Sequence, residues 1–338
     1  MQLQERINAF TQLGQKMAEI VLDPIAFKEL LDQVYAHNKW FTPTNCIAAM
    51  EQWSLLLETE LLTQWTLDLP QANKNPKTIA LILAGNIPLV GFHDILAALI
   101  SGHRLLGKVS SNDPILTKYV IDLLIQAEPR FADQVSWSET PLKGFDAVIA
   151  TGSNNSALYF DHYFGKYPHI IRKNRNSIAL LTGQESDNEL AGLATDIFQY
   201  FGLGCRSVSK LYVPEGYDFD RFFKAVFTFK EHINHNKYMN NYDYNKAIYL
   251  MDQASILDNE FLLLKEDNGL SSPIAVLYFS FYHSLTEATQ DISRIQQQIQ
   301  CVVGKNLPID HVDFGQTQRP NLADFADGVN TLAFLQNL

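Results

Sequence analysis

Apolar residues recur at helical spacing through the first part of the chain. Ile7, Phe10, Leu13 and Met17 share one face of an expected helix, and the same spacing continues to Leu62. The pattern predicts several amphipathic helices before residue 70. A polar stretch over residues 71–77 predicts a linker.

From residue 78 onward the pattern changes to short apolar runs separated by amphipathic stretches. Such runs predict buried strands, and the amphipathic stretches predict helices. The expected strands span residues 78–84, 104–109, 145–150, 177–181, 211–213 and 274–281. Strands that alternate with helices are typical of a mainly parallel sheet covered on both faces. The sequence therefore predicts an α/β fold.

Residues that favour helix starts mark several of the expected boundaries. Pro88 suits the first turn of a helix that runs to about Ile100. Residues 186–189 form one capping box, and residues 284–287 form another that opens a helix to about Gln300. The tail after residue 304 has no clear periodicity.

Charge excludes one class of partner. The 338 residues include 26 basic and 37 acidic side chains, so the net charge is −11. Because an acidic surface repels phosphate backbones, we expect no nucleic-acid partner. Residues 78–100 are the most apolar stretch, but polar residues interrupt it, so we expect a strand and a helix instead of a membrane span.

Cysteine usage favours a reducing, cytoplasmic setting. The three cysteines Cys46, Cys205 and Cys301 cannot all pair, and their spacing is not typical of a disulfide framework. The first ten residues show no signal for secretion. His232 and His235 share an expected helical face, but no third ligand has suitable spacing, so no metal site is expected.

Three expected strands end in polar or glycine-rich turns. These turns are Gly85-Asn86, the segment from Lys108 to Ser111, and Thr151-Gly152-Ser153. Ligands of open α/β sheets bind beyond the carboxyl ends of the strands, and the next helix attracts anions. Three such turns in consecutive units favour a nucleotide site. Simple helix capping is the alternative explanation of the same residues.

Cys205 is the candidate nucleophile. It follows Gly202 and Gly204, whose small size leaves room for a substrate carbonyl to approach the sulfur. Arg206 and the following turn would favour the thiolate, which is the nucleophilic form. The alternative is an inert cysteine that follows a helix. Cys46 and Cys301 lack polar neighbours and are expected to be structural.

Taken together, these residues resemble the aldehyde dehydrogenase superfamily, and most closely its fatty acyl-CoA reductase branch, the reductases of bacterial bioluminescence operons. The likeness covers about residues 78–281. The family's Asn-x-Pro motif is matched by Asn86-Ile87-Pro88, and its Lys-Pro-Ser motif by Lys108-Val109-Ser110. Its Gly-Ser-Thr motif is matched by Gly152-Ser153-Asn154. Its Gly-x-x-Cys motif is matched by the segment from Gly202 to Cys205, and Lys210 stands in place of a downstream arginine.

The resemblance implies an aldehyde-dehydrogenase-like fold with two domains and a cleft between them. It implies that Cys205 attacks the thioester of a fatty acyl-CoA and that the Asn86 amide stabilises the oxyanion. It also implies that NADPH or NADH reduces the resulting thioacyl-enzyme to an aldehyde. The expected cofactor-binding residues are Lys108, Ser110, Gly152, Ser153 and Glu266.

Two departures from the family pattern bear on the reaction. The glutamate that activates water in hydrolytic members has no counterpart, because residues 171–177 contain no carboxylate. Reduction of an acyl-CoA is therefore favoured over oxidation to an acid. The element that contacts the nicotinamide ribose is reduced to the segment from Gly269 to Pro273, where Glu266 or Asp267 is the expected substitute. Arg172 and its basic neighbours form either a phosphate site or a solvated face.

The sequence predicts three segments with different roles. Residues 1–176 hold the N-terminal helices and a nicotinamide-cofactor domain, residues 177–304 hold the catalytic thiol domain, and residues 305–338 form a tail. The terminal segments 1–77 and 305–338 are candidates for a homodimer contact. Two rival functions stay open: an acyltransferase that uses Cys205 without hydride transfer, and a scaffold without activity.

Overall fold

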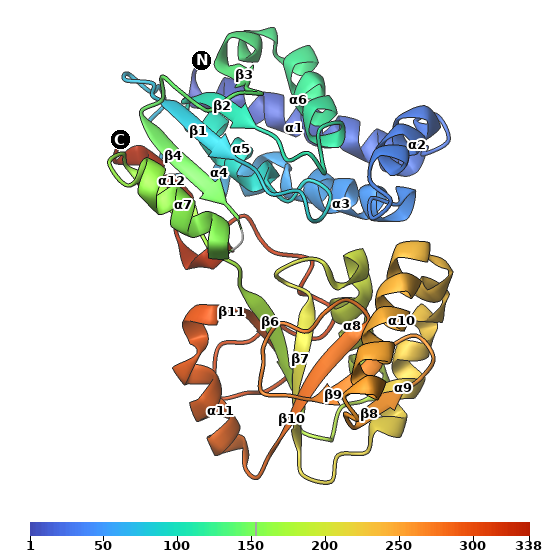
Figure 1. The fold of residues 1–338 in the computed structure, drawn as a ribbon. Helices are drawn as coiled ribbons and strands as arrows, with labels where there is room; N and C mark the ends of the chain where they lie inside the picture. The colour runs from blue at the N-terminus through green and yellow to red at the C-terminus, as the bar shows by residue number, and fades with distance from the viewer. Residues whose placement is uncertain (153) are drawn as a thin grey trace. The chain divides into compact units, whose positions relative to one another are not determined.

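The computed structural model describes residues 1–152 and 154–338. The chain forms two compact units (Figure 1). The first contains Met1–Asn174 together with Asn321–Leu338, and the second contains Arg175–Pro320. Each unit is built around a mostly parallel sheet with helices, which confirms the predicted α/β fold.

The first unit is built on a parallel sheet with strand order β3-β2-β1-β4-β5. The strands are β1 (Thr78–Ile82), β2 (Arg104–Lys108), β3 (Val135–Trp137), β4 (Ala147–Thr151) and β5 (His169–Arg172). The helices are α1 (Leu3–Leu22), α2 (Lys28–His37), α3 (Pro43–Leu56), α4 (Thr59–Trp65), α5 (Phe92–Ile100), α6 (Leu116–Ala127), α7 (Asn154–Phe164) and α12 (Thr331–Gln336), with 3₁₀ turns at Pro129–Gln134 and Ala326–Gly328.

This strand order reverses direction at β1, so the point between β1 and β4 is the topological switch point of the sheet. Ligands of open α/β sheets bind at such a point, beyond the carboxyl ends of the strands. The helices expected before residue 70 are present, and the predicted apolar face of α1 is buried at Phe10, Leu13 and Met17.

The second unit is built on a sheet with strand order β11-β6-β7-β10-β9-β8, in which β8 alone of the described strands runs antiparallel to its neighbour. The strands are β6 (Asn176–Leu180), β7 (Val208–Pro214), β8 (Ile256–Asp258), β9 (Leu263–Glu266), β10 (Val276–Tyr282) and β11 (Ile299–Val303). The helices are α8 (Asp187–Phe198), α9 (Phe219–Val226), α10 (Asn236–Met251) and α11 (Leu285–Arg294), with 3₁₀ turns at Gln199–Gly202, Phe227–Asn234 and Gln296–Gln298.

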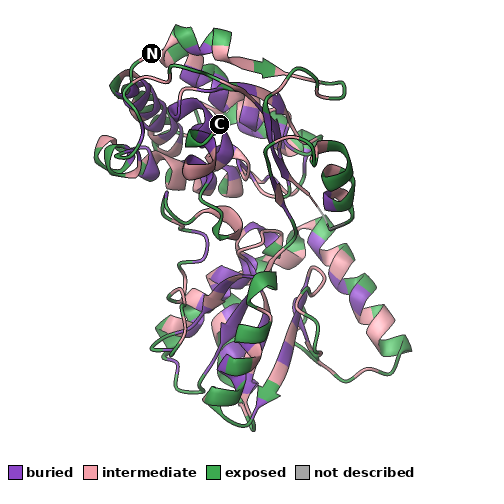
Figure 2. Ribbon diagram, turned by 90° about the vertical axis from the view of Figure 1, so that its left-hand side faces the viewer, coloured by how far each residue is buried: buried purple, intermediate pink, exposed green. Residues whose placement is uncertain are grey.

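The core of each unit lies between its sheet and the helices that cover it. Figure 2 shows the strands mostly buried, while the outer faces of the helices are exposed. The capping box predicted at Ser186 is present: its hydroxyl accepts a hydrogen bond from the Glu189 N–H, and the Glu189 carboxylate accepts from the Ser186 N–H. This cap fixes the start of α8.

Two expected boundaries are wrong. The helix predicted from Pro88 begins at Phe92 instead, because Leu89 adopts a left-handed conformation with φ of 57° that an α-helix does not allow. The helix predicted to reach Gln300 ends at Arg294, and the apolar residues that follow it form β11. A short buried strand and the end of a helix can have the same apolar composition, so the sequence pattern did not separate them here.

The expected tail 305–338 is divided between the two units. Residues up to Pro320 pack in the second unit, and Asn321–Leu338 return to the first. There His93 shares a hydrogen bond with the carbonyl of Leu322 at 2.9 Å, and Arg172 donates to the Thr331 hydroxyl at 2.9 Å. Among the described helices, none is both long and apolar enough to cross a membrane.

Candidate active site

The carboxyl edge of the first sheet brings together two of the turns predicted to bind the cofactor. Lys108 is the last residue of β2, and its carbonyl accepts a hydrogen bond from the N–H of Leu83 at 3.1 Å. A Cβ on Gly85 would lie 2.6 Å from the Cβ of Ser110. The turns after β1 and β2 therefore touch, and the glycine permits this contact.

The third predicted turn follows β4 and lies across the switch point from β1. A Cβ on Gly152 would lie 2.8 Å from the Cβ of Ser156 and 2.9 Å from the ring of Phe160, so the glycine lets α7 pack against the strand end. Asn86 is exposed in the turn after β1. Ser153 lies outside the described residues.

The residues at this edge offer donors to a ligand with hydroxyl and phosphate groups. The turns that carry Asn86 and Gly152 follow the two strands at the switch point, and the turn of Lys108 and Ser110 follows the next strand. An ammonium and a hydroxyl at a strand end are donors that match the hydroxyl and phosphate oxygens of such a molecule.

Arg172 does not serve as a phosphate ligand. It is 4% exposed, and its guanidinium forms an ion pair with the carboxylate of Asp94, which is also buried. A second N–H of Arg172 donates to Thr331. Of its two basic neighbours, Lys173 is exposed, and Arg175 donates to the carbonyl of Ile299 at 3.4 Å.

Cys205 lies in the second unit, between a 3₁₀ turn and β7. Three consecutive residues shortly before it, Tyr200, Phe201 and Gly202, have φ values of 55°, 58° and 73°. Two aromatic residues in the left-handed region are strained, and packing must hold them there. The ring of Phe201 supplies part of that packing, with its centroid 4.5 Å from that of His235.

Hydrogen bonds from distant parts of the second unit fix the backbone around Cys205. The hydroxyl of Ser177 donates to the Cys205 carbonyl at 2.9 Å, and Arg206 Nε donates to the Thr317 carbonyl at 2.7 Å. The Gln318 amide donates to the hydroxyl of Ser207 at 3.2 Å. Arg206 is therefore bound to the backbone carbonyl of Thr317, a contact that the sequence did not predict.

The buried carboxylate of Asp196 holds the segment that contains Gly315 and Thr317. Asp196 is 1% exposed and accepts hydrogen bonds from the N–H of Gly315 at 2.7 Å and from the N–H and hydroxyl of Thr317 at 3.0 and 2.8 Å. Burial raises the pKa of Asp196, and the hydrogen bonds to its carboxylate act in the opposite direction. Asp196 and Thr317 stand far apart along the chain, so no local motif could have identified them.

Glu266 is the last residue of β9 and is exposed. Strand register places it beside Phe279 of β10. The carboxylate of the neighbouring Asp267 forms an ion pair with Lys265 and accepts a hydrogen bond from the N–H of Gly269 at 2.8 Å. The side chain of Asp267 therefore shapes its own loop.

The other two cysteines are buried, as expected. Cys46 is 0% exposed and Cys301 is 5% exposed, and burial raises the pKa of Cys46 to about 12. Neither forms a disulfide, and in the described part of the chain no group of three His, Cys, Asp or Glu side chains is arranged to hold a metal ion.

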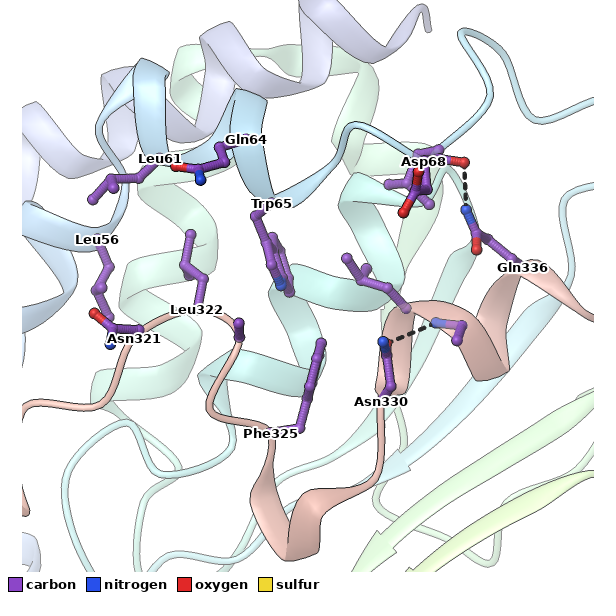
Figure 3. Close-up of a pocket in the computed structure, with 14 residues that line it drawn as sticks. Leu56, Leu61, Gln64, Trp65, Asp68, Asn321, Leu322, Phe325, Asn330 and Gln336 are labelled. Atoms are coloured by element: carbon purple, nitrogen blue, oxygen red, sulfur yellow. Dashed lines mark hydrogen bonds between the residues drawn. The ribbon is translucent and has the colours of Figure 1, made fainter. Parts of the chain in front are cut away.

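A cavity of about 540 Å³ lies in the first unit. Figure 3 shows the rings of Trp65 from α4 and Phe325 from the C-terminal segment lying side by side in it. At one end the Gln336 amide donates to the carbonyl of Asp68 at 2.6 Å. None of the residues predicted to act in catalysis lines this cavity, so we assign it no part in the reaction.

Comparison with known proteins identifies the family. The family model of acyl-CoA reductase (LuxC) matches residues 36–234, which is more than half of the chain. The chain belongs to the acyl-CoA reductase family. The match includes Asn86, Lys108, Gly152 and Cys205, but it ends before Glu266. A comparison with curated proteins finds no match.

Solved structures show the same fold at low sequence identity. Aldehyde dehydrogenase 21 from Physcomitrella patens matches with a TM-score of 0.70 at 12% identity, over 100% of this chain and 84% of that one. An NAD-dependent aldehyde dehydrogenase from Sinorhizobium meliloti gives a TM-score of 0.66 at 14% identity, over 91% and 71%. Aldehyde dehydrogenase C from Pseudomonas syringae, solved with NAD⁺ and octanal, gives 0.64 at 13% identity, over 91% and 73%.

The acyl-CoA reductase family and the aldehyde dehydrogenase fold confirm the resemblance that the motifs predicted. The protein is an acyl-CoA reductase, an NAD(P)H-dependent oxidoreductase that acts through a catalytic cysteine.

Proposed function

We propose that Cys205 is the nucleophile of this acyl-CoA reductase. The observation that carries the proposal is exposure: Cys205 is partly exposed, whereas Cys46 and Cys301 are buried. Cys205 also lies within the family match, and Ser177 anchors its carbonyl. A thiol must reach a bulky thioester to react with it, and only an accessible sulfur can do so.

In the proposed reaction, the Cys205 thiolate attacks the carbonyl carbon of the acyl-CoA. The bond from that carbon to the CoA sulfur then breaks, CoA leaves as a thiolate that takes up a proton, and the acyl group stays on Cys205. The Asn86 amide and the Cys205 N–H are the proposed oxyanion donors, and such a donor contributes about 3 kcal/mol.

The proposed cofactor is NADPH or NADH. When bound, the nicotinamide would supply a hydride to the thioacyl carbon, and cleavage of the carbon–sulfur bond would release the aldehyde and restore the Cys205 thiolate. We place Lys108, Ser110, Gly152 and Ser153 on the cofactor, with Glu266 on its nicotinamide ribose. The switch-point position of the Gly152 turn supports this assignment, as does the NAD⁺ bound to the structural relative from Pseudomonas syringae.

The segment that replaces the family's hydrolytic glutamate supports reduction over hydrolysis. Residues 171–177 contain no carboxylate, and Arg172 within it is buried in an ion pair. No general base from this segment can activate water against the thioester. The acyl-enzyme would then persist until it is reduced. We propose that the acyl group it carries is a fatty acyl chain.

The setting of the reaction is also a proposal. Three thiols without a disulfide suit the reducing cytoplasm. A homodimer is the proposed assembly, with residues 1–77 and 305–338 as candidate contacts.

The test is intact-mass spectrometry after mixing with acyl-CoAs of graded chain length, with and without NADPH. Without NADPH, the mass of the wild-type protein should rise by one acyl group, and NADPH should remove the adduct and release aldehyde. Cys205→Ala should form neither product, while the control Cys301→Ala should form both. An adduct on Cys205→Ala would overturn the assignment, and an adduct that NADPH cannot remove would favour the acyltransferase.

A further inference from the structure

The loop between β9 and β10 is held by contacts that the family motifs do not explain. The sequence resemblance predicts that its residues from Gly269 to Pro273 replace the family's element for the nicotinamide ribose. The N–H of Asp267 donates to the Phe279 carbonyl at 3.0 Å, and the hydroxyl of Ser280 donates to the Asp267 carbonyl at 3.2 Å. These two contacts tie the start of the loop to β10.

A bulge in β7 provides the next contact. Ser177 pairs with Val208 and Ile178 pairs with Lys210, so Ser209 is an extra residue in the ladder. Its hydroxyl donates to the carbonyl of Leu270 at 2.6 Å and lies 3.4 Å from the carbonyl of Ser177.

Ser177 is also the residue whose hydroxyl anchors the Cys205 carbonyl. A continuous set of contacts therefore runs from the nucleophile, through Ser177 and the bulged Ser209, to Leu270 of the loop. Bulges are frequent next to active sites, where they re-aim a side chain.

Lys210 of β7 also supports the loop between β9 and β10. It is 1% exposed, and its ammonium donates to the main-chain carbonyl of Asp267. The ammonium also lies 5.3 Å from the centre of the Tyr212 ring. Because the Asp267 carboxylate forms an ion pair with Lys265, Lys210 acts on the backbone of the loop.

We propose that Lys210 is a positioning residue for the cofactor: it fixes the loop after β9 in the conformation that receives the nicotinamide ribose. This inference rests on the proposed function. Because the Lys210 ammonium is a buried charge, it needs the Asp267 carbonyl and the Tyr212 ring as partners. An apolar side chain of the same length would leave the Asp267 carbonyl with the Ser280 hydroxyl alone as its side-chain donor, and the loop would lose order.

The charge of Lys210 gives the proposal a pH signature. Burial lowers the pKa of Lys210 to about 8, and the Asp267 carboxylate partly opposes this effect. The groups that face it are the Asp267 carboxylate, the Lys265 ammonium beyond it, and the rings of Tyr212 and Tyr278 on β7 and β10. Above pH 8 the ammonium loses its charge, and its hold on the carbonyl weakens.

The test compares Lys210→Met and Lys210→Arg with the wild type, with Lys224→Met on α9 as an exposed-lysine control. NADPH affinity is measured by fluorescence in the absence of acyl-CoA. Lys210→Met should weaken NADPH binding about tenfold, while the rate of acylation by acyl-CoA alone changes less than twofold. Lys210→Arg and the control should bind within about threefold of the wild type. Wild-type affinity should fall above pH 8, and that of Lys210→Arg should stay constant.

Hydrogen exchange of the cofactor-free protein provides a second readout. Lys210→Met should speed exchange in residues 267–275 and leave residues 200–207 unchanged. Equal loss of acylation and NADPH binding, or unchanged binding, would overturn the positioning role. If the wild type forms no acyl-enzyme, the proposed function fails instead, so the two failures are distinguishable.

Discussion

The hydroxyl of Ser177, on β6, donates a hydrogen bond to the carbonyl of Cys205 at 2.9 Å. This bond joins the first half of β6 to the turn that carries the proposed nucleophile, across 28 positions of sequence. It fixes the peptide group that follows Cys205. The direction of the thiol therefore depends on the sheet as well as on its own turn.

Replacing Ser177 by alanine should slow acylation more than it lowers stability. The lost hydrogen bond costs about 1 kcal/mol of folding free energy, whereas a misdirected nucleophile reduces the acylation rate by about tenfold or more. Stopped-flow acylation and urea unfolding measure the two effects. The control is Ser293→Ala, whose hydroxyl bonds within α11 to the carbonyl of Thr289. Equal rates for the two variants would contradict the role of Ser177.

Asp196 should be among the most sensitive positions of the second unit. Asp196→Ala leaves the buried N–H and hydroxyl of Thr317 and the N–H of Gly315 without their acceptor. Unsatisfied buried groups cost about 1–3 kcal/mol each. Because the Thr317 carbonyl also accepts from Arg206, the turn around Cys205 should loosen as well. Chemical denaturation and the rate of Cys205 alkylation should both change. The control is Asp291→Ala, which removes a partly exposed carboxylate that pairs with Arg294 within α11.

Local motifs predicted much of the fold and part of the site. The glycine turns and the capping box at Ser186 are each encoded within a few neighbouring residues, so the sequence was sufficient for them. The role of the Cys205 thiol stays a prediction. The residues that hold the backbone around Cys205 could not be predicted in this way. Ser177, Asp196 and Thr317 meet only because β6, α8 and the segment after β11 fold together, and no spacing along the chain reveals that.

The same limit explains the element boundaries that were missed. β11 is a short apolar strand next to a helix end, and its strand character comes from pairing with β6. Arg172 was ambiguous for a related reason. Its buried partners, Asp94 and Thr331, lie 78 and 159 positions away, so a basic run alone could not distinguish an ion pair from a phosphate site.

Gly85 and Ser110 should show coupled effects. Gly85→Ala places a Cβ 2.6 Å from the Ser110 Cβ and 3.3 Å from the N–H of Asp113, which forces the two turns apart. We expect a loss of about 1–3 kcal/mol in stability and weaker NADPH binding. Adding Ser110→Gly should recover most of the stability, because it removes the nearest atoms. Additive losses in the double variant would show that the two turns do not touch.

The buried pair of Asp94 and Arg172 should behave as a unit. Removing one partner leaves an uncompensated buried charge, so Arg172→Met should cost about 3–5 kcal/mol in the free energy of unfolding. The double variant with Asp94→Leu should lose less than Arg172→Met alone. Urea unfolding of the three variants measures the coupling. Arg130→Met, which breaks an exposed pair with Glu128, should have a much smaller effect.

Asp113 should make stability depend on pH in an unusual direction. It is 4% exposed and accepts hydrogen bonds from the N–H and hydroxyl of Thr117 at 3.2 and 2.7 Å. Burial raises its pKa from the ordinary 3.8 to about 6, and those hydrogen bonds oppose the rise. Between these two values the folded protein holds a proton that the unfolded chain has released.

The contribution of Asp113 to stability is therefore fully present below pH 3.8 and is lost as the pH rises through about 6. Because a tenfold change in proton affinity corresponds to about 1.4 kcal/mol, the expected loss is about 3 kcal/mol. Other carboxylates titrate in the same range, so the quantity to measure is the difference in unfolding free energy between the wild type and Asp113→Asn. That difference should change between pH 4 and 6 and stay constant above 7. The exposed Asp122→Asn on α6 should show no such change, and a constant difference for Asp113→Asn would mean that this carboxyl titrates normally.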